Sequence, residues 1–188
     1  MNKSDVFSKE LGYITEFKVR SFVEYCLNEK VPDYFFKIPA SSTGKYHPAY
    51  SLGEGGLVRH TKAAVKLAND LLNLEQNIHL ANFRSEITAA LILHDSIKQG
   101  FNGSCYTVPE HPLCAVSMIL TANKEKNKLS DTQCKMICDL IASHMGQWNT
   151  GYKSKTEILP KPKTELQKFV HTCDYLASRR YLDVDLEG

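Results

Sequence analysis

The chain has 188 residues, a net charge of +2 and 43% hydrophobic residues. This composition excludes a disordered chain, a collagen and a coiled-coil rod, and so small a net charge gives no support to nucleic-acid binding driven by charge. No apolar run approaches the ~20 residues that span a bilayer. The first residues, Met-Asn-Lys-Ser-Asp, contain no apolar signal-peptide core. We therefore expect a cytoplasmic protein that does not bind membranes.

Apolar residues recur at helical spacing through most of the chain. In the segment 57–74, Leu57, Ala64 and Leu71 lie on one face together with His60, as in an amphipathic α-helix. Ser130 and Thr164 are each followed three residues later by glutamine, a capping pattern that opens a helix. The spacing predicts helices over residues 14–28, 57–74, 84–95, 112–122, 130–145 and 164–180.

The connections between these helices are polar or rich in glycine and proline. We expect loops over 33–56, 99–110 and 146–163, and a charged surface linker over Asn123–Lys128. No segment alternates between apolar and polar residues as a half-buried strand does. The sequence therefore predicts an all-α fold of about six to eight helices. We expect one domain over 1–188, with the motifs described below at about 40–180 and an N-terminal helical extension over 1–39.

The cysteine pattern gives no sign of a zinc site. None of the six cysteines forms a Cys-x-x-Cys pair. Cys134 and Cys138 are four residues apart on a predicted helix, but no second pair completes four zinc ligands. We interpret the cysteines as small buried residues in a reducing compartment.

Three histidines and one aspartate lie on apolar helix faces, where polar residues are unexpected. His60 occupies a core position, His94 ends the apolar run 89–93, and His144 and Asp174 have apolar neighbours one turn away. A lone histidine in such a place is more often a hydrogen-bonded core residue than a ligand, but a buried aspartate is costly unless it is paired or binds a metal. Since four helices carry the same feature, we favour a shared metal site of the kind found in helical bundles.

The order of these residues resembles the HD-domain superfamily of metal-dependent phosphohydrolases. The segment 55–61, Gly-Gly-Leu-Val-Arg-His-Thr, is similar to the helix start that carries the first histidine in many of these proteins. The segment 94–98, His-Asp-Ser-Ile-Lys, is similar to the His-Asp-x-Gly-Lys pattern of the exoribonuclease-like branch, with Ile97 in place of glycine. The resemblance covers about residues 40 to 180 and implies an HD-like helical bundle.

The same resemblance implies two further histidine ligands. His111, in Glu-His-Pro, looks like the third-histidine segment, and His144 resembles the first histidine of a later His-His-Gly segment, with Met145 replacing the second. In members with two ions such histidines hold the second ion, and the aspartate of the His-Asp pair bridges both. The cyclic-di-nucleotide phosphodiesterases are less similar, because Gly56 stands where they carry glutamate. The implied ligand set is His60, His94, Asp95, His111, His144 and Asp174.

Imidazole and carboxylate ligands suit one or two divalent ions such as Mn, Fe, Ni, Co, Zn or Mg. An ion with an open position lowers the pKa of bound water from ~15.7 toward ~7, and the resulting hydroxide can attack phosphorus. Asp95 and Lys98 are the catalytic candidates. Lys98 lies one turn after His94 and either contacts the scissile phosphate or is a solvated surface lysine. If a single ion binds, His111 or His144 would protonate the leaving group.

Four other residues are candidates for substrate contact or support. Trp148 and Tyr152 can stack on a base or pin their loop, and His47 either contacts substrate or packs its loop. His171, three residues before Asp174, either orients a ligand or simply lies on a helix face. His79 is interpreted as a surface residue.

The resulting prediction is a metal-dependent phosphohydrolase or phosphodiesterase. It would act on a small phosphorylated substrate: a nucleotide, a cyclic nucleotide or a short oligonucleotide. Two alternatives remain. One is a di-iron oxygenase, since a related helical fold with the same ligand order supports that activity. Redox-active bound iron would favour this alternative. A non-catalytic nucleotide-binding protein would retain its ligand without turnover.

Overall fold

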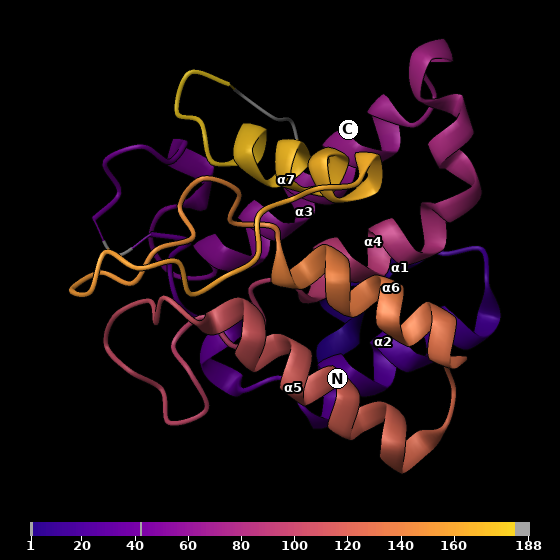
Figure 1. The fold of residues 1–188 in the computed structure, drawn as a ribbon. Helices are drawn as coiled ribbons and strands as arrows, with labels where there is room; N and C mark the ends of the chain where they lie inside the picture. Colours follow the sequence, from indigo (N-terminus) through magenta and orange to yellow (C-terminus); the bar gives the residue numbers. More distant parts are fainter. Residues whose placement is uncertain (1, 42, 183–188) are drawn as a thin grey trace.

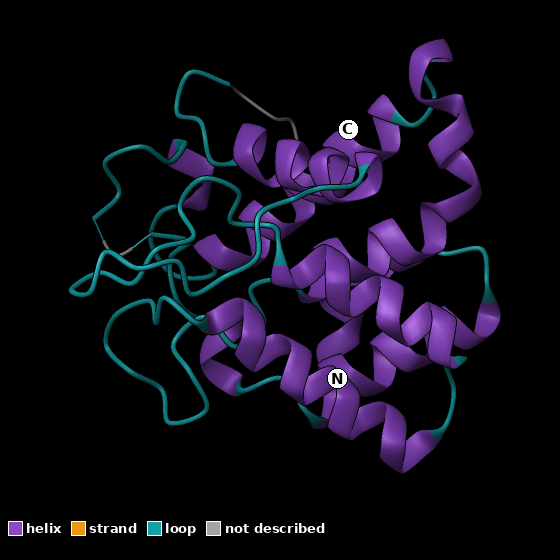
Figure 2. Cartoon of the chain, in the orientation of Figure 1, coloured by secondary structure: helices purple, strands orange, loops and turns teal. Residues whose placement is uncertain are grey.

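The computed structural model describes residues 2–41 and 43–182, so both ends of the expected domain 1–188 lie outside the described residues. Over the described ranges the chain forms seven α-helices and four short 3-10 helices and no β-strand (Figure 2). One isolated bridge joins Thr150 and Glu157. The predicted all-α bundle is confirmed. In chain order the elements are η1 (Lys3–Phe7), α1 (Ser8–Leu11), α2 (Phe17–Glu29), η2 (Asp33–Phe36), η3 (Ala49–Ser51), α3 (Gly56–Leu71), η4 (Glu75–Phe83), α4 (Arg84–Leu93), α5 (His111–Lys126), α6 (Asp131–Ala142) and α7 (Glu165–Ala177).

Helix α4 lies at the centre of the bundle. It packs against α2, α3, α6 and α7, while α3 also contacts α7 and α5 contacts α6 (Figure 1). Every residue of α4 after Arg84 is buried, as expected for a helix whose apolar residues surround its axis. The chain leaves this helix at His94, so the His-Asp pair emerges in the protein interior.

The starts of α6 and α7 follow the capping pattern in the sequence. The hydroxyl of Ser130 accepts a hydrogen bond from the backbone N–H of Gln133, and Thr164 does the same for Gln167. Each glutamine side chain also accepts a hydrogen bond from the N–H of its cap residue. Such caps satisfy backbone donors that have no partner within the helix.

The expected linker Asn123–Lys128 is wrong for most of its length, because α5 continues to Lys126. Lys124 and Lys126 lie in the last turn, where positive charge stabilises the negative end of the helix dipole. The helix ends at Asn127, whose positive φ of 47° is the left-handed conformation that commonly follows a helix. Charge in this segment therefore marks a helix end and not a loop.

Other predicted boundaries also differ. The helices expected over 14–28, 57–74, 130–145 and 164–180 are observed as Phe17–Glu29, Gly56–Leu71, Asp131–Ala142 and Glu165–Ala177, so His144 lies after its helix. The loop expected over 33–56 contains two short 3-10 helices, Asp33–Phe36 and Ala49–Ser51. The helix expected over 84–95 ends at Leu93, and His94 and Asp95 lie in the turns that follow. The 3-10 helix η4 was not predicted, because its residues show no helical repeat of apolar side chains.

Helix α3 begins at Gly56, where a Cβ atom would lie 2.2 Å from the carbonyl oxygen of Ser51. Glycine is therefore required for the close approach that starts the helix carrying His60.

One hydrophobic core joins the N-terminal segment to the helices that carry the motifs. Phe7, Phe22 and Phe35 are fully buried in the same cluster as Leu91 and Val170. Each large side chain removed from water in this way contributes about 1.5–3 kcal/mol. The segment 1–39, as far as it is described, is thus part of the same packed interior.

The cysteines mostly match their interpretation as buried residues. Cys26, Cys134, Cys138 and Cys173 are buried, while Cys105 is exposed, and all six are free thiols. Burial raises the pKa of Cys138 to about 12, which keeps this thiol protonated and unreactive.

The long loops gather at one end of the bundle. The segments 37–41, 43–55, 99–110 and 146–163 lie together on the left in Figure 1. Among the described residues no helix has both the length and the apolar character needed to cross a bilayer.

Candidate metal centre

The six expected ligands meet in the interior, although they come from five helices or their ends. His60 lies within α3, Asp174 within α7, and His111 is the first residue of α5. His94 and Asp95 follow α4, and His144 follows α6 by two residues. All are buried apart from Asp174, whose side chain is 16% exposed.

One group of donors forms between α3, α4 and α7. The Nε2 atom of His60 lies 2.9 Å from Oδ1 of Asp174, and Nε2 of His94 lies 3.4 Å from the same oxygen. The donor atoms of these three residues all lie within 4.8 Å of one another. They can therefore share one ion.

A second group surrounds Asp95 and also includes His94. Donor atoms of His94, Asp95 and His144 lie within 4.8 Å of one another. The Oδ1 atom of Asp95 is 2.9 Å from Nε2 of His111 and 3.8 Å from Nε2 of His144. Its other oxygen, Oδ2, is 3.5 Å from Nε2 of His94. The two oxygens of Asp95 thus face different histidines, which is the arrangement a bridging carboxylate needs.

Three of the imidazoles are oriented in the same way. In His94, His111 and His144 the Nδ1 atom donates a hydrogen bond to the backbone carbonyl three residues earlier, at 2.6, 2.8 and 2.7 Å. A carbonyl oxygen can only accept a hydrogen bond, so Nδ1 carries the hydrogen. The lone pair of Nε2 is therefore free to coordinate a metal ion. The accepting carbonyls belong to Leu91, Val108 and Ile141.

The two carboxylates are ionised in spite of their surroundings. Burial by itself would raise the pKa of Asp95, but Lys98, His94 and His111 hold it well below its usual value. Burial also opposes ionisation of Asp174, whose pKa His60 and His94 keep well below the ordinary range. The carboxylates in turn raise the pKa of His94 against the effect of burial.

Several atoms in this cluster lack the partner that a buried polar atom requires. Nε2 of His94, Nε2 of His111 and Oδ1 of Asp95 are buried without a hydrogen bond among the described residues. An unsatisfied buried group costs about 1–3 kcal/mol. Ligands bound at ~2.0–2.2 Å to one tetrahedral or octahedral ion lie roughly 2.9–3.5 Å apart. The separations of 2.9, 3.4 and 3.5 Å match this range, and the 3.8 Å between His144 and Asp95 lies just above it. The residues around His94 and Asp174 therefore fit a divalent ion as they stand.

A cavity of about 160 Å³ opens onto this centre. Lys98 lies at its wall, with its ammonium group paired to Asp95 and its side chain only 12% exposed. His47 also lines the cavity, 5.7 Å from the ring of His60, and burial lowers its pKa to about 4. Its Nδ1 atom is buried without a partner among the described residues. Both residues therefore lie where a substrate would meet the centre.

The two aromatic candidates are placed differently. Trp148 lines the cavity. Tyr152 is 81% exposed and is not part of the cavity wall, and its ring lies near the ammonium group of Lys155 instead. Of the pair, the structure brings only Trp148 to the centre.

His171 supports the centre from behind His144. Its Nδ1 donates a hydrogen bond of 2.6 Å to the backbone carbonyl of His144. The close packing depends on Gly146, which has a φ of +59° and whose Cβ position would lie 2.2 Å from the imidazole ring of His171. Of the two interpretations of His171, this contact favours the residue that orients a ligand. His79 is exposed and pairs with Glu165.

The cavity is also lined by three residues that the sequence analysis did not identify, Tyr175, Ser178 and Arg179. They follow Asp174 closely, and this proximity was the available signal. Arg179 lies beyond the end of α7, where helical spacing no longer predicts the direction of a side chain.

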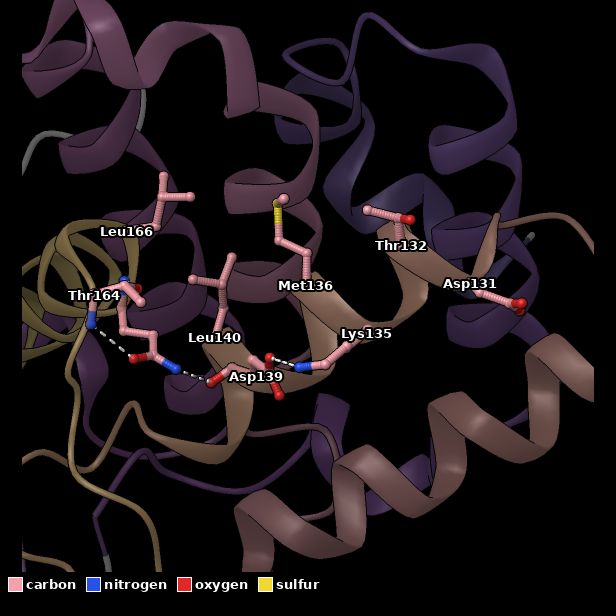
Figure 3. Close-up of a pocket in the computed structure, with 9 residues that line it drawn as sticks. Asp131, Thr132, Lys135, Met136, Asp139, Leu140, Thr164 and Leu166 are labelled. Atoms are coloured by element: carbon pink, nitrogen blue, oxygen red, sulfur yellow. Dashed lines mark hydrogen bonds and ion pairs between the residues drawn. The ribbon is translucent and has the colours of Figure 1, made fainter.

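A separate groove with apolar side chains in its lining lies away from this centre. It runs between α6 and the start of α7, where Figure 3 shows the side chains of Met136, Leu140 and Leu166 beside the pair formed by Lys135 and Asp139. None of the six clustered histidines and aspartates lines it. The groove therefore contains none of the candidate metal ligands.

Comparison of the chain with protein-family models, curated proteins and solved structures found no match. The resemblance to the HD-domain superfamily accordingly depends on the motif residues themselves.

Proposed function

We propose that this chain is a metal-dependent phosphohydrolase of the HD-domain type, acting on a phosphoester of the nucleotide class. The observation that carries the proposal is the buried convergence of four histidines and two aspartates beside a cavity that also presents Lys98. Oxygen and nitrogen donors of this kind are the ligands that first-row divalent ions accept. In the described chain neither donor group includes a cysteine.

The proposed ligand assignment follows the two donor groups. His60, His94 and Asp174 would hold one ion together with Asp95. His111 and His144 would hold a second, with Asp95 contributing to both. Divalent ions held there lower the pKa of a coordinated water from ~15.7 toward ~7 and so supply a nucleophile at neutral pH.

The remaining residues of the cavity have separate tasks in this proposal. The backbone hydrogen bonds at Nδ1 keep the imidazoles of His94, His111 and His144 oriented. His171 holds the backbone of His144 in place. Lys98 stabilises negative charge on the phosphoryl group, as a fixed cation beside a reacting phosphate does.

The charges in the cavity favour this activity over a di-iron oxygenase. Lys98 and Arg179 line the wall and balance the charges of the two carboxylates there, Asp95 and Asp174. Divalent ions bound by those carboxylates would make the cavity positive, and a positive cavity favours an anionic substrate. A phosphoester meets that requirement, whereas dioxygen and a neutral organic substrate do not.

The test is a metal measurement coupled to an activity screen. Purified protein should contain at least one transition-metal ion, as measured by inductively coupled plasma mass spectrometry. The Asp95→Ala variant should lose this ion. Asp139→Ala, which removes an exposed carboxylate that pairs only with Lys135 among the described residues, is the matched control and should retain the ion.

The same preparations should hydrolyse phosphomonoesters or diesters from a nucleotide panel. Activity should disappear with chelation and return with Mn, Ni or Co. If fully metallated protein hydrolyses no member of the panel, the proposal is wrong. Oxygen consumption or tight nucleotide retention would then identify the alternative.

A further inference from the structure

Three side chains in mutual contact line the cavity: Trp148, Tyr175 and Arg179, here called the aromatic–arginine wall. The rings of Trp148 and Tyr175 are stacked, with centroids 5.7 Å apart and planes 12° from parallel. The guanidinium carbon of Arg179 lies 4.4 Å from the centroid of Tyr175 and 5.9 Å from that of Trp148. Stacking on an aromatic face holds a guanidinium in place while leaving its edge free for hydrogen bonds.

Arg179 carries a charge that the described part of the chain, residues 2–41 and 43–182, does not neutralise. Among these residues its Nε and one terminal nitrogen hydrogen-bond to the hydroxyl of Ser178, at 3.1 and 2.8 Å. No carboxylate of the described chain lies within ion-pair distance of it, in contrast to Lys98, which pairs with Asp95. A guanidinium has five N–H donors, so donors remain for an anion approaching from the cavity.

Trp148 offers an aromatic surface at the mouth of the same cavity. One side of its ring is stacked on Tyr175, yet the residue is still 45% exposed. The cavity, at about 160 Å³, is smaller than the ~300 Å³ typical of pockets that enclose a whole small-molecule ligand. It can hold a phosphoryl group and the adjoining part of a sugar, and a base attached to that sugar would lie outside, at the level of Trp148.

We propose that the aromatic–arginine wall recognises the substrate outside the metal centre. Arg179 binds an oxygen of the phosphoryl group, and Trp148 stacks on a nucleobase. This inference rests on the proposed function for the phosphoester, and it adds that a base-bearing phosphoester is preferred over a plain sugar phosphate. Tyr175 is a positioning residue that holds the other two.

The test measures binding without turnover. The ligands are the phosphonate analogue of adenosine 5′-monophosphate, whose P–C bond resists hydrolysis, and the matching phosphonate of ribose alone. Calorimetry gives the affinity for each. Trp148 is the single tryptophan of the chain, so its fluorescence independently reports whether the base reaches the wall.

Substitutions of Arg179 and Trp148 should have different effects on the two ligands. Arg179→Ala should weaken both ligands about tenfold or more, as for loss of a charged hydrogen bond. Trp148→Ala should weaken only the nucleoside ligand, by about fivefold or more, since stacking needs the base. Arg180→Ala removes the same charge from the next residue, whose side chain is exposed and outside the cavity, and should change neither.

Three results would overturn the inference: equal affinity for the two ligands, unchanged affinity in Arg179→Ala, or an equal loss in Arg180→Ala. Thermal melting of each variant shows whether it is folded, and Arg179→Lys restores charge if Ala disturbs the fold. If the wall variants weaken ligand binding but the protein hydrolyses no substrate, the proposed function is wrong and the binding role of the aromatic–arginine wall still holds. Hydrolysis unaffected by either wall variant would refute the wall alone.

Discussion

Replacing Gly146 by alanine tests the support of the candidate centre. Gly146 has a φ of +59°, and an alanine Cβ would lie 2.2 Å from Cε1 and 2.4 Å from Nε2 of His171. No real side chain tolerates such contacts, so the imidazole of His171 must move. It would then lose its 2.6 Å hydrogen bond to the carbonyl of His144.

The expected loss of stability has two parts. A left-handed backbone costs an alanine about 1–2 kcal/mol, and loss of the hydrogen bond from His171 costs about 0.5–1.5 kcal/mol. Together they predict a decrease of about 1.5–3.5 kcal/mol in the free energy of unfolding. Urea denaturation should show this as a lower midpoint with an unchanged slope.

A double-mutant cycle with His171→Ala isolates the contact between the two residues. With the imidazole gone, Gly146→Ala should cost only the backbone share of about 1–2 kcal/mol. Gly53→Ala is the matched control, because Gly53 has a φ of +68° but its Cβ would meet no atom within 4 Å. It should cost the same in both backgrounds. If Gly146→Ala is also equally costly in both, the proposed displacement of His171 does not occur.

Three further predictions concern the centre and the thiols. Manganese at ~100 times its dissociation constant should raise the melting temperature by about 5–10 °C, and Asp95→Ala should abolish that shift in a thermal scan; a persisting shift would mean the ion binds elsewhere. Lys98→Ala should lower turnover by about 10² with no loss of metal, and a metal-depleted variant would show that Lys98 acts through Asp95 instead. A thiol reagent should modify Cys105 first, since it is exposed, whereas Cys138, with its pKa raised to about 12, should react only on unfolding; peptide mapping after brief labelling decides between them.

The helical fold could be predicted because its signals are local. Apolar spacing and the caps at Ser130 and Thr164 depend on residues one turn apart, so the sequence displays them directly. The many charged residues of Asn123–Lys128 did not distinguish a loop from a helix end. Lysines in that segment stabilise the last turn of a helix as readily as they would solvate a loop.

The candidate centre shows which site signals survive in a sequence. His60, His94, His144 and Asp174 could be selected because each interrupts an apolar face, and the structure brings them together. His111 begins its helix and interrupts no apolar face, so only the resemblance singled it out.

Residues of the cavity wall were harder to choose. Tyr152 and Trp148 share one loop, and sequence spacing in a loop does not tell which ring turns inward. Arg179 stacks on Tyr175, four residues earlier and within the helix expected over 164–180, but neither residue interrupts an apolar face, so nothing in the sequence singled them out.

The pairing of His60 with Asp174 joins residues 114 positions apart at 2.9 Å. Because proteins are synthesised from the N-terminus, the nascent chain carries α3 to α6 for some time before α7 exists. During that interval His60 has no carboxylate partner from α7, and a premature stop codon anywhere ahead of position 174 would leave it so permanently. The group of His60, His94 and Asp174 can therefore be completed only in a chain that has been translated through α7, whereas His94, Asp95 and His144 are all present before that.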